Sequence, residues 1–247
     1  MRLSFRYGCE LPIARMKIVR TIVLQAGSNI VRVSERLTNT ACCDTPFTMC
    51  QHVTLGPPFL EPGVTAFDMS GARGRTFPCE FSKAQRMKSD AAFTWPDGPG
   101  RKGKVDLRFM GKGRNSDFVS VEMDRKQEHA WFSALNPRLG LMIAYVWRRS
   151  DYPWTGIWEE SFARREKPWN GKSLTRGMEF TNSPFPVGLR KAVDMGSLHG
   201  QPTFRWLPAR GALTFEYSIL AVPVDPDCKG VAAITPEKKK FKVDLIV

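Results

Sequence analysis

A histidine beside a rigid turn is the first residue whose type and position suit chemistry. His52 lies on a predicted strand that starts at Pro46, and the turn Gly56-Pro57-Pro58 follows it. An imidazole gives or takes a proton near neutral pH, and side chains at strand ends beside turns are well placed for a site. An alternative is a histidine that packs on a strand face and hydrogen bonds to the backbone, and spacing alone leaves both open.

Carboxylates in two later segments are the candidate partners of an imidazole acid. Glu179 lies among apolar neighbours, which favours burial and a raised pKa, although Arg176 would oppose that shift. Glu159 and Glu160 are adjacent on a predicted strand and must point to opposite faces, so at most one of them enters a given site. A surface ion pair explains each carboxylate about as well as catalysis does.

Tryptophans gather in the same part of the sequence. Trp154 directly precedes the predicted strand 155–162, Trp158 lies within it, and Trp169 precedes Asn170 in a loop. Aromatic rings beside polar side chains can hold the C–H face of a sugar while its hydroxyl groups form hydrogen bonds. The same rings could instead form the aromatic core of a sandwich.

The elements that must position these residues are mainly strands. Apolar residues alternate with polar ones, and Gly and Pro turns separate the runs. This pattern predicts an all-β, antiparallel β-sandwich with few short helices, the best helix covering 187–195. Residues 71–113 read as loops around one or two short strands. The predicted strands cover 18–24, 30–37, 118–123, 130–135, 139–147, 155–162, 174–181, 203–207 and 212–222.

Charge, apolar runs and cysteine spacing argue against several classes of protein. The 247 residues carry a net charge of +13, but basic residues are scattered, with one dense run at 238–240 and no nucleic-acid-binding motif, so we expect no specific nucleic-acid partner. No apolar run reaches membrane-spanning length. Six cysteines without a C-x-x-C spacing indicate reduced thiols and a cytoplasmic protein.

Several enzyme classes lack their sequence signatures here. No phosphate-binding loop, no G-x-G-x-x-G and no G-x-S-x-G occurs in the chain. Its three histidines are well separated and have no spaced partner, which makes a metal site a weak hypothesis. We therefore expect neither a cofactor nor a metal.

Two stretches resemble the galactose mutarotase-like (aldose 1-epimerase) superfamily. They are Glu35-Arg36-Leu37-Thr38-Asn39-Thr40 and the run from Gln51 to Glu61, which is similar to an uncharacterised bacterial branch. Further similarity covers 132–160, 169–186 and 204–209. The resemblance spans about residues 15 to 223, is specific for the superfamily, and is poor for substrate.

The resemblance implies a sugar cleft on one sheet and interconversion of the anomers of a free aldose without a cofactor. His52 matches the acid position. Glu179 is our choice for the base, because it lies on a late strand before a Ser-Pro turn, and Glu160 is the fallback. The family's usual base-strand motif is not reproduced here. We expect the sugar to be bound by Trp154, Trp158, Trp169, Asn170, Arg176 and Asn182.

The resemblance also predicts how the chain is divided into domains. The superfamily has several strands before the part that matches Ile18, so we expect a sandwich domain over residues 1–223 that lacks its first strands, and a C-terminal extension over 224–247. The family's substrate-binding Asp motif is not evident. A non-catalytic carbohydrate-binding module on the same sandwich is the alternative function.

Overall fold

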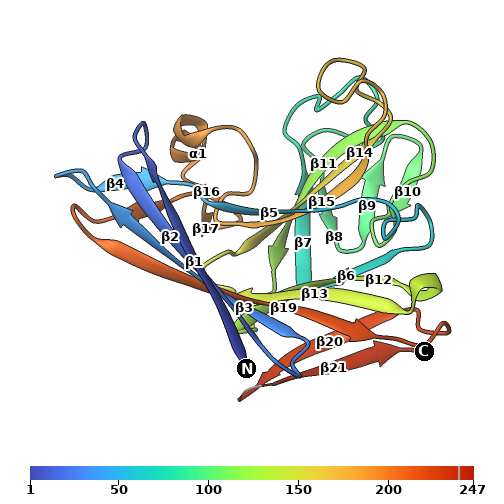
Figure 1. Cartoon of the computed structure of the whole chain (residues 1–247). Helices are drawn as coiled ribbons and strands as arrows, with labels where there is room; N and C mark the ends of the chain where they lie inside the picture. The colour runs from blue at the N-terminus through green and yellow to red at the C-terminus, as the bar shows by residue number, and fades with distance from the viewer. Residues whose placement is uncertain (239) are drawn as a thin grey trace.

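The structure of the protein is a computed structural model that describes residues 1–238 and 240–247. Lys239, the middle of the basic run, lies outside the described residues. Strands dominate and form two large antiparallel sheets, as the alternating sequence predicts (Figure 1). The all-β sandwich is therefore confirmed.

The larger sheet has seven strands and the smaller has six. In order, the larger contains β1 (Arg2–Leu11), β2 (Met16–Gln25), β3 (Ile30–Asn39), β19 (Ala212–Pro223), β13 (Leu141–Arg148), β12 (His129–Asn136) and β6 (Ala66–Met69). The smaller contains β5 (Cys50–Leu55), β15 (Leu174–Thr181), β14 (Trp154–Ser161), β11 (Asn115–Met123), β7 (Gly71–Thr76) and β8 (Ala92–Thr94).

Short elements connect or flank these sheets. The two-stranded pairs are β9 (Asp97–Gly100) with β10 (Gly103–Asp106), β16 (Ser197–Leu198) with β17 (Gln201–Pro202), β4 (Thr45–Phe47) with β18 (Arg205–Leu207), and β20 (Gly230–Glu237) with β21 (Lys240–Ile246). The helices are η1 (Pro137–Leu139) and α1 (Leu189–Met195), the latter inside the predicted 187–195.

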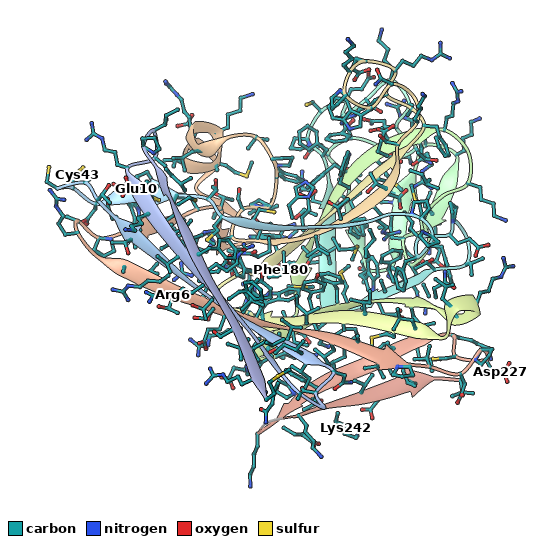
Figure 2. The ribbon with its side chains drawn as sticks, in the orientation of Figure 1. Arg6, Glu10, Cys43, Phe180, Asp227 and Lys242 are labelled. Carbon is teal, nitrogen blue, oxygen red and sulfur yellow. The ribbon has the colours of Figure 1, made fainter. Side chains whose placement is uncertain are left out.

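The main core lies between the two sheets and is rich in aromatic rings. Trp147 of β13 stacks on Phe180 of β15, with ring centroids 4.4 Å apart and planes 15° apart. Tyr145 and Phe132 of the larger sheet stack on each other beside them. Phe180 lies where the two sheets meet (Figure 2). These rings alternate with outward residues along their strands, which is why the period-two pattern fixes the buried face.

The C-terminal hairpin β20–β21 covers part of the outer face of the larger sheet. Val231 and Ile234 of β20 pack there against Trp131, Met142 and Leu220. Residues 224–247 thus add a third layer at one end of the sandwich (Figure 1).

Two sequence-based expectations about strands were wrong. Residues 71–113 contain four short strands, β7 to β10, where one or two were expected, because their many Gly and Pro residues hide the alternation. Residues 2–11 form a full strand, β1, that we did not predict, although Leu3, Phe5, Tyr7, Cys9 and Leu11 alternate cleanly.

Candidate active site

The outward face of the six-stranded sheet brings His52 and Glu179 together. Strands β5 and β15 are antiparallel neighbours, and their register places His52 directly opposite Glu179. The His52 Nε2 atom lies 3.1 Å from the Glu179 Oε1 atom. The two residues proposed from the sequence as acid and base therefore lie within ion-pair distance of each other.

The two members of this pair differ in exposure. The Glu179 side chain is 10% exposed, whereas the His52 side chain, on the edge strand β5, is 55% exposed. Burial raises the pKa of the Glu179 carboxyl, and the charge of His52 and the Cys50 thiol oppose this rise only in part. A raised pKa brings a carboxylate base closer to neutral pH, where proton transfer in both directions is efficient.

Neighbouring side chains hold the His52 imidazole in place. Its Nδ1 atom lies 3.0 Å from the Thr54 hydroxyl, on the same face of β5. The ring also makes an edge contact with Trp158, with centroids 5.9 Å apart. These contacts orient Nε2 toward Glu179.

Glycines make room for the Glu179 carboxylate. A Cβ atom at Gly177 would lie 2.8 Å from Glu179 Oε1, and Gly156, opposite Glu179 on β14, lets the ring of Phe118 approach. The Cys50 sulfur lies 3.9 Å from Glu179 Oε2. Desolvation and the charge of Glu179 raise the pKa of this thiol, so it stays protonated at neutral pH.

A hollow of about 130 Å³ opens beside Glu179. Its lining combines the Glu179 carboxylate, the hydroxyl groups of Thr181 and Ser183, and the rings of Phe118 and Phe185. Rings next to hydroxyl and carboxyl groups suit a small polyol. A larger hollow of about 780 Å³ lies on the outer face of the other sheet, among residues such as Arg32 and Glu216. We place the candidate site at the smaller hollow because Glu179, the carboxylate of the His52–Glu179 pair, lines it.

The start of β5 is fixed to the end of β15. The Asn182 side-chain oxygen accepts a hydrogen bond of 2.8 Å from the Met49 N–H, and the Thr181 hydroxyl donates one of 3.0 Å to the Met49 carbonyl. Asn182 itself is 1% exposed. It lies next to the hollow and positions the strand that carries His52.

The other predicted binding residues lie at different distances from the pair. Trp158 touches His52, whereas Trp154, four residues before Trp158 on β14, is fully buried near the His199 ring. Trp169 and the exposed Asn170 lie on the loop after β14. Arg164, which the sequence analysis did not select, connects them, since its guanidinium lies over the rings of Trp158 and Trp169.

Glu160 and Arg176 both form hydrogen bonds with groups other than His52 and Glu179. Glu160 is buried and accepts hydrogen bonds from the N–H groups of Ala163 and Arg164, at 2.7 and 2.9 Å. Arg176 lies on the inner face, opposite to Glu179, and its guanidinium donates to Glu159 at 3.0 Å. Burial lowers the pKa of Arg176 to about 10, which still leaves it charged at neutral pH. The structure therefore separates Arg176 from the His52–Glu179 pair.

The described residues do not meet the requirements of a metal-ligand cluster or of a membrane-spanning helix. Residues 1–238 and 240–247 contain no group of three or more His, Cys, Asp or Glu side chains arranged to hold a metal ion. No helix among them is long and apolar enough to cross a membrane. All six cysteines, which belong to the described residues, are free thiols.

The architecture is that of the galactose mutarotase-like β-sandwiches. Solved structures with this fold include a candidate aldose 1-epimerase from Klebsiella pneumoniae, with a TM-score of 0.64 and 12% identity over 91% of this chain and 52% of that chain. A candidate aldose 1-epimerase from Escherichia coli K12 gives a TM-score of 0.59 and 13% identity, over 90% of this chain and 66% of that one.

A third structure, a galactose mutarotase-like protein from Clostridium acetobutylicum, gives a TM-score of 0.55 and 9% identity over 90% of this chain and 62% of that chain. The chain thus spans between 52% and 66% of the length of these structures. The sequence matches no protein-family model and no curated protein. At these identities the likeness establishes the fold.

Proposed function

We propose that this protein binds a free aldose and interconverts its α and β anomers. The observation that carries the proposal is the opposed pair formed by a buried carboxylate, Glu179, and an exposed imidazole, His52, with 3.1 Å between them. The fold shared with aldose 1-epimerase-like structures supports a sugar as the ligand.

The reaction needs one base and one acid acting on two oxygens of the same carbon. Glu179 removes the proton from the anomeric hydroxyl, while the His52 imidazolium gives a proton to the ring oxygen. The bond between the ring oxygen and C1 breaks, and the open-chain aldehyde forms. Rotation about the C1–C2 bond turns the carbonyl, and the reverse proton transfers close the ring on its other face.

The geometry of the pair suits these steps. The two oxygens share one carbon, so the acid and the base must be close together, as Nε2 and Oε1 are. An arriving sugar takes the place of their direct contact. Protons return to their original owners at the end of each cycle, so no cofactor or co-reactant is consumed.

The test is anomer exchange measured by NMR across a panel of free and phosphorylated aldoses, with spontaneous mutarotation subtracted. We expect acceleration for at least one sugar, and its loss in both His52→Ala and Glu179→Gln. A folded sample that binds a sugar without accelerating exchange would overturn the catalytic proposal and favour a carbohydrate-binding module.

A further inference from the structure

Strand β1 lies at one edge of the seven-stranded sheet. Among residues 1–238 and 240–247, β1 pairs with β2 alone and forms one end of the seven-stranded sheet. All ten of its residues are exposed (Figure 2 labels Arg6 and Glu10). A long exposed edge strand is a template for pairing with another strand.

The hydrogen-bond pattern identifies which residues face this edge. The Met1 carbonyl accepts a bond from the Ala26 N–H, which makes odd-numbered residues of β1 the ones bonded to β2. The N–H and C=O groups of the even-numbered residues therefore point away from β2. These residues are Arg2, Ser4, Arg6, Gly8 and Glu10.

The side chains of β1 divide into an apolar and a polar row. Phe5 and Tyr7 lie on the inner side of the sheet yet are 70% and 51% exposed, because the second sheet does not extend over them. The polar row contains Arg2 and Glu10 near its two ends. No ion pair involves either residue within the part of the chain that the structure describes.

We infer that β1 is the interface for a second copy of this chain, which adds its own β1 in antiparallel fashion about a two-fold axis at Arg6. In this register Arg2 lies opposite Glu10 of the second copy, twice by symmetry, and Ser4 lies opposite Gly8. The five residues whose N–H and C=O groups point away from β2 then all form hydrogen-bonded pairs with residues of the second copy. On the apolar side Phe5 meets Tyr7, again twice.

The neighbouring register is poorer. Centred on Tyr7, it pairs Arg2 with Pro12, which has no N–H, and leaves fewer edge groups bonded. It also removes the Arg2–Glu10 charge pairs. In the Arg6-centred register the two positively charged Arg6 side chains approach each other at the axis, which is unfavourable. Replacing Arg6 therefore tests this register.

Sedimentation velocity over a range of protein concentrations tests the inference. We expect a monomer–dimer equilibrium that weakens roughly tenfold in Arg2→Glu and in Glu10→Arg, because each change turns two attractive pairs into repulsive ones. The double variant, Arg2→Glu with Glu10→Arg, should restore dimerisation. Arg6→Thr should strengthen it by removing the like charges at the axis.

A cross-link tests the register directly. Leu3 and Cys9 of the second copy form a non-hydrogen-bonded pair, whose Cα separation of about 4.5 Å allows a disulfide. Leu3→Cys should give a covalent dimer under mild oxidation, whereas Leu11→Cys, opposite Met1, should not. A protein that stays monomeric, or one whose association ignores the charge exchange, would overturn the inference.

Discussion

Glu179 and His52 occupy directly opposite positions on two neighbouring antiparallel strands, with Oε1 and Nε2 3.1 Å apart. Cross-strand pairs of this kind are held by the backbone ladder, so the sheet itself sets their separation. Only the carboxylate is buried, so the pair joins a desolvated carboxylate to an imidazole that solvent can reach. This relationship leads to four predictions, for Glu179 and for other residues of the strands that carry this pair.

Gly177→Ala should displace the Glu179 carboxylate without unfolding the protein. The added methyl group would lie 2.8 Å from Glu179 Oε1 and 3.3 Å from the Trp158 Cβ atom, so the carboxylate must move away from His52. A displacement of this size can reduce a rate on the order of a hundredfold. Anomer exchange by NMR measures the effect.

Gly56→Ala is the matched control for this substitution. Its added methyl group would meet only the Leu174 carbonyl oxygen, at an ordinary distance of 3.6 Å. We expect unchanged exchange in this variant. Equal rates in Gly177→Ala and Gly56→Ala would show that the position of the carboxylate is unimportant.

Glu179→Gln should stabilise the protein at alkaline pH relative to the wild type. Burial raises the folded-state pKa of Glu179, so the wild type loses stability as pH rises from the unfolded-state pKa through the folded-state pKa. Glutamine cannot ionise and avoids this loss. Urea unfolding at pH 4 and pH 8 should show the advantage of the variant growing with pH, and a shrinking advantage would contradict the raised pKa.

Gln51→Leu should loosen the strand that carries His52. Gln51 points inward, donates a hydrogen bond to the buried Glu35 carboxylate, and lies 3.0 Å from the Tyr152 hydroxyl. Loss of the Gln51 amide leaves Arg20 as the remaining polar partner of Glu35 among the described residues. Leaving a buried polar group short of a partner costs about 1–3 kcal/mol in the free energy of unfolding.

His52→Gln provides the comparison for Gln51→Leu, because the two neighbours lie on opposite faces of β5. The exposed His52 side chain should contribute less than about 0.5 kcal/mol to the free energy of unfolding. Chemical denaturation of both variants checks this contrast. An equal loss of unfolding free energy in the two variants would contradict a stabilising role for the contacts of Gln51 with Glu35 and Tyr152.

Arg176→Met should destabilise the fold strongly and leave sugar recognition in any folded fraction intact. Arg176 is fully buried and lies 3.0 Å from Glu159, which also pairs with Arg86. Removing one member of a buried ion pair typically costs about 3–5 kcal/mol. The exposed Arg114 is the control, since Arg114→Met should change thermal unfolding little.

Alternation in the sequence is enough to predict the fold class and the faces of most strands. It also contains information that the sequence analysis did not use. Arg176 and Glu179 are three residues apart on one strand, so they must lie on opposite faces, and the structure places them so. Strand β1 shows the same alternation and was missed.

The pairing of distant strands is what the sequence could not provide. His52 and Glu179 meet because β5 joins β15 at the end of the smaller sheet, and nothing in the local spacing of either strand specifies that neighbour. The resemblance to mutarotase-like proteins suggested the two residues separately. The role of Arg164 was also hidden, since it depends on a loop that folds back over Trp158.

A double-mutant cycle on anomer exchange tests the central claim most directly. His52→Gln, Glu179→Gln and the double variant would be compared with the wild type on the sugar that it accelerates best. Because the two groups act on one reaction as a unit, each single variant should lose most of the acceleration, and the double variant should lose little more. Single variants that keep the wild-type rate, or losses that multiply in the double variant, would contradict an acid and base working as a pair.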